Sequence, residues 1–479
     1  MLNRKFSYLN SRTNHSRDVT CHKDECTNYI NMKTAIPINK KLFDIYLLFT
    51  REPFVQYFSE ELEFYHNGNG GLLGLISLDL TDNDYYGCIF SRDKSKQYRA
   101  EIVEASIPTI EEARKWIDEK MGSNSIVFHD NSHDFFDLFK ELNNDEKQHP
   151  NYKLLKTNIA LSSAKEVIKE ISYHYKDIDG NFIEQFQSLN GFDSRVWELF
   201  LFCFFREQFF SFKRNYNAPD YMIEKFNQEI AIEAVIVSRK TDFEIELKSQ
   251  EEIQKKLNNE VPLLFGNALF DKMKKKYWEK EHVKDKPFVI AIADFHDTMS
   301  MTWTYNALLE YLYGYKYEHS FDKNGKLVVK PVRIGNYIKP NGTKIPSGFF
   351  FQPDSENVSA IIFSSSGTLS KFNRMGKQAG LGSEVPILIR MGAFYNHEPN
   401  ANKPHLINYT VDENSNETWS EGTVVFHNPN AKIPLNPAFF DDRVAQSFFE
   451  NEFIYSKMPK VFPYNSFTQN LIPKEEMKK

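Results

Sequence analysis

The spacing of hydrophobic and polar residues changes along the chain and predicts three structured regions. The first combines short alternating segments, which favour β-strands, with a helix whose start is indicated by the capping-box pair Thr109 and Glu112. A polar stretch at residues 143–149 is typical of a linker. We therefore predict a flexible N-terminal tail at residues 1–35 and a small α+β domain at residues 36–148.

The hydrophobic runs become longer in the second region, residues 149–310. Helical spacing leads into residues 196–205, two strands follow, and then comes a long helical stretch that we expect to break near Pro262. Residues 286–295 form a continuous apolar run, which is typical of a strand buried on both faces. Residues 311–479 return to short apolar strands and predict a β-rich α+β domain. The predicted fold class is therefore a multidomain combination of α/β and α+β.

Composition narrows the class of protein without naming a function. Of 479 residues, 41% are hydrophobic and 26% are charged, which is typical of a folded globular chain. The net charge of −6 excludes a surface covered in basic residues, although a local basic groove stays compatible with it. The longest apolar run, residues 199–205, is far shorter than a membrane span, and the N-terminus lacks the apolar segment of a signal peptide. We expect a cytoplasmic protein that does not enter a membrane.

Three acidic residues stand where hydrophobic ones are expected. Glu198 lies in the apolar helical run, Asp220 follows Pro219 at the start of a predicted strand, and Glu233 interrupts the next strand. Burying an unpaired carboxylate costs roughly several kcal/mol, so each needs a cation or hydrogen-bond donors. If the two strands form a hairpin, Asp220 and Glu233 meet near one end of the sheet. Carboxylates, waters and a backbone carbonyl are ligands that Mg²⁺ accepts.

A simpler interpretation of Glu198 places it at a solvent edge or beside an arginine. Arg206 and Arg214 are the partners considered, and Glu207, in the polar stretch after the helix, is explained by solvation. The same reasoning extends to all three acids, which would then be ordinary salt-bridge partners in an unrelated α/β protein.

The order of these acids and elements resembles the PD-(D/E)XK nuclease superfamily. The resemblance covers residues 196–295 and rests on a helix with Glu198, Pro219–Asp220 at a strand and Glu233 on the next. It implies a central restriction-endonuclease-like αβββαβ core, flanked by the N- and C-terminal α+β domains. It further implies a DNA nuclease that uses Mg²⁺ or Mn²⁺, whose metal ligands are Asp220, Glu233, Glu198 and the backbone carbonyl of Ala234.

The sequence departs from the family at one position, because Val235 stands where the motif has lysine. Some members supply this lysine from the following helix, and Lys272 is the candidate here. It shares a helical stripe with Phe265 and Leu269, which should face the sheet. There it would orient or help deprotonate the attacking water. The alternatives are that Lys272 belongs, with residues 274–276, to a solvated basic face or that it contacts DNA phosphates.

The resemblance also implies that the flanking domains select substrate or partner, as in restriction and other prokaryotic defence. The expected partners are DNA, a second copy of the chain or a protein of a defence system. Val235 favours an alternative function, a catalytically degenerate module that binds nucleic acid or protein. His296 and Asp297 are secondary site candidates after the buried strand. Two further sets of residues could bind a metal. We interpret the first, Cys21, His22 and Cys26, as part of a flexible tail. We interpret the second as the solvated start of a helix, and it consists of His129, Asp130, His133 and Asp134.

Overall fold

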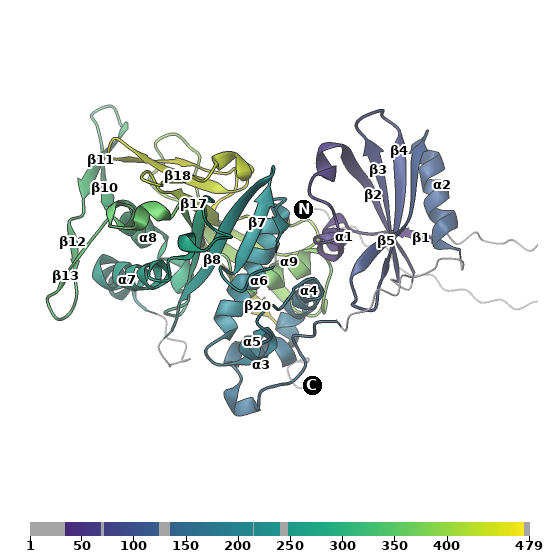
Figure 1. Cartoon of the computed structure of the whole chain (residues 1–479), viewed down its shortest axis with the longest axis horizontal. Coiled ribbons are helices and arrows are strands. Elements are labelled where there is room, and N and C mark those ends of the chain that lie inside the picture. The colour runs from purple at the N-terminus through teal and green to yellow at the C-terminus, as the bar shows by residue number, and fades with distance from the viewer. Residues whose placement is uncertain (1–33, 69–70, 124–134, 214, 240–247, 474–479) are drawn as a thin grey trace, which may run out of the picture.

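The computed structural model describes residues 34–68, 71–123, 135–213, 215–239 and 248–473. Within these ranges the chain is a mixed α/β structure with several sheets and nine α-helices. The two sets considered as metal sites, within residues 21–26 and 129–134, lie outside the described residues. In Figure 1 a five-stranded sheet lies at the right and an eight-stranded sheet at the left.

The five-stranded sheet is antiparallel, and its strands follow one another in chain order. Helix α2 (Ile110–Met121) covers one face, and Thr109 accepts the predicted capping bond from the backbone N–H of Glu112. Helix α1 (Lys40–Leu47) packs on the other face through Phe43 and Leu47. The strands are β1 (Ala35–Pro37), β2 (Ser59–Asn67), β3 (Leu72–Asp79), β4 (Tyr85–Arg92) and β5 (Tyr98–Ile107).

The stretch predicted to be a linker is attached to the helices that follow it. The Gln187 side chain accepts from the backbone N–H groups of Leu142 and Asn143 and donates to the carbonyl of Lys140. These bonds fix residues 140–143 against helix α5. The helices of this part are α3 (Pro150–Thr157), α4 (Ser162–Ser172), α5 (Phe182–Gln187) and α6 (Phe192–Glu207).

The eight-stranded sheet has the order β19-β18-β17-β14-β9-β8-β7-β6. Strands β8, β9 and β14 are parallel, whereas β7 is antiparallel to both β6 and β8. From α6 the chain therefore runs helix, three strands, helix α7 (Gln250–Met273) and strand. The strands are β6 (Ser211–Phe212), β7 (Tyr221–Lys225), β8 (Gln228–Val237), β9 (Phe288–Asp294), β14 (Ala360–Ser364), β17 (Thr423–His427), β18 (Ala445–Glu450) and β19 (Phe453–Lys457).

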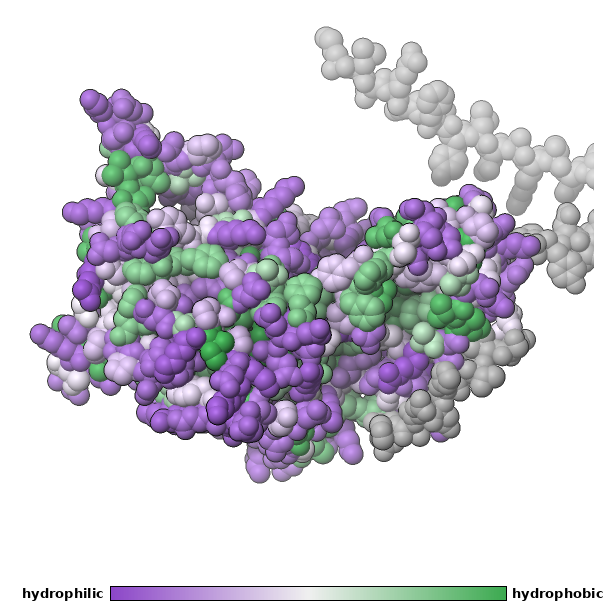
Figure 2. Space-filling model, turned by 45° about the horizontal axis from the view of Figure 1, so that its top comes forward, coloured by the Kyte–Doolittle hydropathy of each residue, from purple (hydrophilic) through white to green (hydrophobic). Residues whose placement is uncertain are grey.

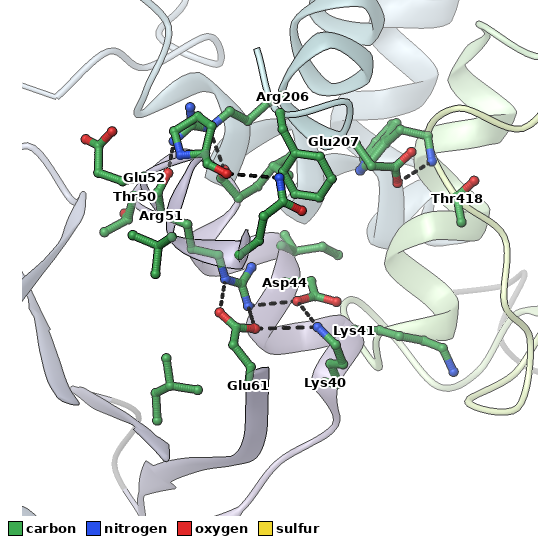
Figure 3. Close-up of a pocket in the computed structure, with 18 of the residues that line it drawn as sticks. Lys40, Lys41, Asp44, Thr50, Arg51, Glu52, Glu61, Arg206, Glu207 and Thr418 are labelled. Atoms are coloured by element: carbon green, nitrogen blue, oxygen red, sulfur yellow. Dashed lines mark hydrogen bonds and ion pairs between the residues drawn. The ribbon is translucent and has the colours of Figure 1, made fainter. Parts of the chain in front are cut away.

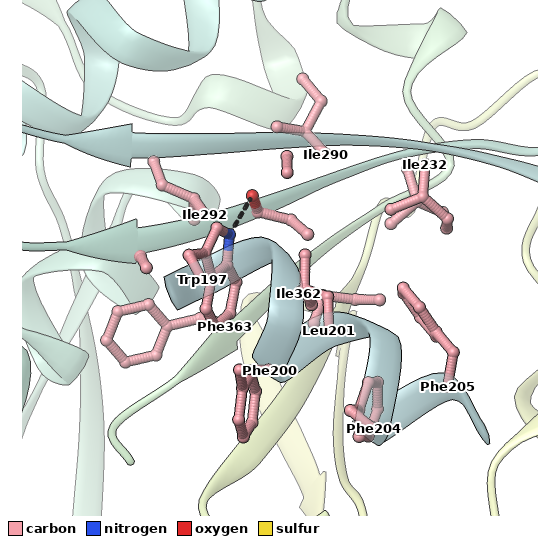
Figure 4. Close-up of a cluster of buried hydrophobic side chains, with 14 of the residues drawn as sticks. Trp197, Phe200, Leu201, Phe204, Phe205, Ile232, Ile290, Ile292, Ile362 and Phe363 are labelled. Carbon is pink, nitrogen blue, oxygen red and sulfur yellow. Dashed lines mark hydrogen bonds between the residues drawn. The ribbon is translucent and has the colours of Figure 1, made fainter. Parts of the chain in front are cut away.

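Helices α6 and α7 cover opposite faces of this sheet. The ring of Tyr221 on β7 contacts Phe205 of α6, and Tyr221 pairs with Ile232, so this face of β8 points to α6. Neighbouring side chains on a strand point to opposite faces, and Glu233 accordingly contacts Lys272 of α7. Figure 4 shows the packed α6 face, where the indole Nε1 of Trp197 donates to the carbonyl of Ala291 at 3.1 Å.

The sheet continues across the predicted boundary between residues 310 and 311. Strands β9 and β14 lie on either side of that boundary and pair in parallel, and one hydrophobic core includes residues from both. The division at residue 310 thus falls inside one sheet and one core. Outside this sheet, the last part of the chain contains α8 (Tyr305–Tyr313), α9 (Leu369–Gln378), the hairpins β10 (Tyr315–Phe321) to β11 (Leu327–Arg333) and β12 (Asn336–Ile338) to β13 (Lys344–Pro346), and a sheet of β16 (His405–Thr410), β15 (Ile387–Phe394) and β20 (Pro463–Leu471).

The predicted break near Pro262 is wrong, because α7 runs from Gln250 to Met273 with this proline inside it. Proline removes one backbone hydrogen bond from a helix, but Val261, Phe265 and Leu269 are buried against the sheet and α8. Burial of this face holds the two halves of the helix in line. Lys272 therefore lies in the last turn of one continuous helix.

A buried cluster of charges joins α9 to the three-stranded sheet. Glu417 accepts from Lys371 at 2.7 Å and from Arg374 at 2.6 Å, and Glu421 accepts from Arg390 at 2.6 Å. Burial alone would raise the pKa of Glu417, but Arg374, Arg390 and Lys371 outweigh it and hold that pKa well below its ordinary value. The cluster therefore keeps Glu417 ionised inside the protein.

Candidate functional site

Glu198 is buried in α6, with 5% of its surface exposed, and it is paired with an arginine. Nη1 of Arg195 lies 2.8 Å from both carboxylate oxygens, and the Tyr175 hydroxyl donates to Oε2 at 3.1 Å. The partner predicted from the sequence was different. Arg206 instead donates to the backbone carbonyl of Leu48, and Arg214 lies outside the described residues.

Asp220 sits where strands β7 and β8 separate. The two strands are joined by Phe226 and Asn227, whose φ angles are 53° and 59°, and they pair as far as Tyr221 opposite Ile232. Beyond that point the pairing with β7 has ended, and the backbone N–H of Ala234 donates instead to Oδ2 of Asp220 at 2.7 Å. The hairpin on which the predicted meeting of Asp220 and Glu233 depends is therefore observed, and Asp220 is bonded to the residue that follows Glu233. The predicted role of the Ala234 carbonyl as a metal ligand stays a prediction.

Glu233 lies in the buried part of β8, and two donors bind the same oxygen of its side chain. Lys272 Nζ is 2.6 Å from Oε1, and the hydroxyl of Tyr277 donates to Oε1 at 2.7 Å. The Lys272 side chain is 20% exposed, whereas that of Lys274 is 75% exposed and pairs with Asp271. The solvated basic face thus explains Lys274 but not Lys272. Tyr277 was not found from the sequence, since nothing in its local pattern connects it with β8.

The three acids share one electrostatic environment. The pKa of Asp220 is raised well above its ordinary value, first by burial and then by the negative charges of Glu233 and Glu198. Lys272 and the Ala234 N–H act in the opposite direction without cancelling this shift. Burial and the charge of Glu233 likewise raise the pKa of the Tyr277 hydroxyl, which keeps it a proton donor at neutral pH. In the metal-free protein, Asp220 therefore keeps its proton to a higher pH than a solvated carboxyl group does.

This shift predicts a stability difference between wild type and Asp220→Asn that depends on pH. The folded protein binds a proton at Asp220 more tightly than the unfolded chain, so its contribution is full below the unfolded pKa of about 4 and falls as pH rises through the folded pKa. The variant carries no such titration. With a chelator present, we expect the melting temperature of Asp220→Asn to rise relative to wild type as pH increases from 4 to 8. A constant difference would show that Asp220 ionises normally.

The three acids offer carboxylate oxygens that suit a hard divalent cation, but these oxygens do not all lie within 4.8 Å of one another. Carboxylate oxygens are the ligands that Mg²⁺ and Mn²⁺ prefer. Among the residues that the structure describes, the one set of three acidic, histidine or cysteine ligand atoms within 4.8 Å of one another is Asp79, Asp82 and Asp84, at the end of β3 and in the turn that follows it. Binding by all three predicted acids would therefore require at least one of them to turn away from its present donor.

The secondary candidates His296 and Asp297 belong to a different part of the sheet. In the parallel pairing Glu233 lies opposite Ile290, whereas the end of β9, Asp294, lies opposite Val237. His296 Nδ1 is 2.6 Å from Oδ1 of Asp294, and Asp297 pairs with Lys256 at 3.0 Å. They form a separate polar group at the carboxyl end of β8 and β9.

Two hollows border helix α6. A polar pocket of about 30 Å³ is lined by Glu198, Arg195, Asp220, Lys176 and Tyr216, among others. It connects the first acid with the second and is large enough for an ion and its water.

The second hollow, of about 970 Å³, lies between the five-stranded sheet and the far end of α6 (Figure 3). Arg51 in its wall pairs with Asp44 and Glu61, and Glu207 accepts from the backbone N–H groups of Trp419 and Ser420. Glu207 is therefore explained by these backbone bonds rather than by solvation. The other basic residues of the wall are also bonded, Lys40 to Asp44, Lys41 to the Glu413 carbonyl, Arg206 to the Leu48 carbonyl and Arg443 to Asp441. Lys40, Arg51 and Arg443 are thus paired with carboxylates, whereas Lys41 and Arg206 donate to neutral carbonyls and keep their positive charge.

Comparison of the chain with family models, curated proteins and solved structures finds no match to any of them.

None of the helices in the described ranges combines the length and the apolar character needed to cross a membrane. The face in Figure 2 is a mixture of hydrophilic and hydrophobic surface.

Proposed function

We propose that the protein is a metal-dependent nuclease that hydrolyses phosphodiester bonds of DNA, with Mg²⁺ or Mn²⁺ held by Asp220, Glu233 and Glu198. The observation that carries the proposal is the contact between Lys272 and Glu233, because it brings a lysine of α7 to the candidate metal ligand on the strand that has Val235 in place of the motif lysine. The element order from α6 to β9 supports an αβββαβ core of the restriction-endonuclease type.

Each side chain has a distinct role in this reaction. Asp220 and Glu233 would hold the ion, and Glu198 would add a further carboxylate ligand if it turned from Arg195. Lys272 donates to the attacking water or to the charge that develops on the phosphate. Tyr277 shares Oε1 of Glu233 with Lys272 and so fixes the orientation of that carboxylate. When bound, the metal would lower the pKa of the attacking water and stabilise the phosphorane-like charge.

The second candidate function is a nuclease-like module without activity. Val235 favours it, and so does the pairing of Glu198 with Arg195, because this ion pair already satisfies a buried acid without a metal. A degenerate site of this kind would bind nucleic acid or a protein partner and would show no thermal shift with Mg²⁺ or Mn²⁺.

Cleavage assays on Lys272→Ala test the two functions against each other. Wild type should cut DNA in Mg²⁺ or Mn²⁺ and not in a chelator, and Lys272→Ala should lower the rate about a hundred-fold or more, because a group that stabilises the transition state is lost. Lys274→Ala is the matched control, since Lys274 lies two positions on and is bonded to exposed Asp271. No metal-dependent cleavage by wild type would reject the nuclease, and equal loss in both variants would remove Lys272 from its mechanism.

A further inference from the structure

Tyr216 lies at the edge of the polar pocket that contains Glu198, Arg195 and Asp220. Its ring stacks on that of His282, with centroids 3.9 Å apart and planes 5° from parallel. The residue is nevertheless 43% exposed. The imidazole covers one face of the ring, and the residue as a whole still exposes this share of its surface.

A hydrogen bond of His282 holds the stacked rings in place. Nε2 of His282 lies 2.8 Å from the carbonyl oxygen of Ala218, two residues after Tyr216 and two before Asp220. This bond ties the imidazole to the segment that carries the candidate metal ligand. A flat aromatic surface is thereby fixed next to the acids at little further cost in conformational entropy.

The pocket itself is too small for a nucleobase. Its volume of about 30 Å³ accommodates an ion or water, and it is lined by the cations Arg195 and Lys176 as well as by acids. Of these acids, Asp177 is occupied by the backbone N–H groups of Gly180 and Phe182. With Arg195 bonded to Glu198, Lys176 is the cation of this lining that remains for a phosphate oxygen, and the attached base has to lie outside the pocket, beside Tyr216.

We propose that Tyr216, supported by His282, is a stacking platform for a base of the substrate strand. The substrate is then a nucleic acid with an unstacked base beside the scissile phosphate, such as a single strand or a frayed end. In an intact duplex each base is already stacked on its neighbours, whereas in a single strand the face of a base is free to pack on an aromatic ring. This inference rests on the proposed nuclease function and names the class of its substrate.

Binding of labelled oligonucleotides to the full chain tests the platform separately from cleavage. All variants carry Glu233→Gln, so that the strand stays intact during the measurement. Tyr216→Ala should weaken binding of a single-stranded thymidine oligomer roughly five- to a hundred-fold, and Tyr216→Phe should bind like the parent. The loss should be absent for a duplex and for an oligomer whose bases have been removed. Tyr455→Ala, at another tyrosine that is 53% exposed, should have no effect.

The outcomes separate the two proposals. The platform is rejected if Tyr216→Ala leaves single-strand binding unchanged, if it weakens duplex and abasic binding equally, or if no oligomer binds. A Tyr216-dependent single-strand affinity in a protein that cuts nothing would overturn the nuclease and leave the platform standing. Cleavage by wild type that is unaffected by Tyr216→Ala would do the reverse. Comparing the affinities of DNA and RNA oligomers of the same sequence shows which sugar the protein prefers beside the stacked base.

Discussion

Replacing Glu233 with glutamine is expected to abolish metal-dependent cleavage while leaving the fold intact. Glutamine has the same size, and its carbonyl oxygen can still accept from Lys272 and Tyr277, so the packing between β8 and α7 should persist. It lacks the negative charge that holds a divalent cation. We expect the cleavage rate to fall roughly a hundred- to a thousand-fold, together with the thermal shift produced by Mg²⁺.

Glu229→Gln is the control for this result. It is the same substitution on the same strand, but Glu229 is partly exposed and pairs with Lys213 and Lys286. Surface pairs of this kind contribute about 0 to 1 kcal/mol, so activity should be unchanged. Full cleavage by Glu233→Gln, measured on protein with a normal circular dichroism spectrum, would remove Glu233 from the mechanism.

The largest effect on stability is expected at Glu417. Glutamine at this position would leave Lys371, Arg374 and Arg390 buried with Glu421 as their remaining acid. Removing one partner from a buried ion pair costs about 3 to 5 kcal/mol, because the opposite charge stays out of water. We expect the urea midpoint of the transition that includes α9 to decrease accordingly.

The exposed neighbour Glu413 provides a matched comparison, since it lies in the same loop and offers only its backbone carbonyl to Lys41. Glu413→Gln should unfold like wild type within about 0.5 kcal/mol. Equal midpoints for the two variants would mean that the three buried cations redistribute without loss when Glu417 is neutral.

Local features of the fold could be predicted from the sequence, and long-range pairing could not. The cap at Thr109, the helix around Glu198 and the fully buried strand β9 each follow from residues that lie within one short window. The sheet that joins β9 to β14 depends on pairing across residue 310, and no local pattern indicates it. At Pro262 the local pattern was misleading, because proline favours a helix break and yet the packing of its neighbours keeps the helix continuous.

The candidate site shows the same division between local and distant information. Glu233 was predicted from an interrupted apolar strand, since a buried charge requires a partner, and Lys272 from the family resemblance together with its place on a helical stripe. Arg195 could have been found, because it precedes Glu198 by three residues and shares its helical face. Tyr277 had no such signal, as its contact with β8 depends on where the chain turns after α7.

The two-residue turn at Phe226 and Asn227 has a consequence for how the site tolerates insertions and deletions. The turn sets which residue of β7 lies opposite which residue of β8. Side chains alternate between faces with a period of two, so one added residue would rotate Glu233 from α7 toward α6 and bring Ile232 or Ala234 under Lys272. Every residue type would be conserved and the site would be lost. Its chemistry is thus encoded in the number of residues between Asp220 and Glu233 as firmly as in their identity.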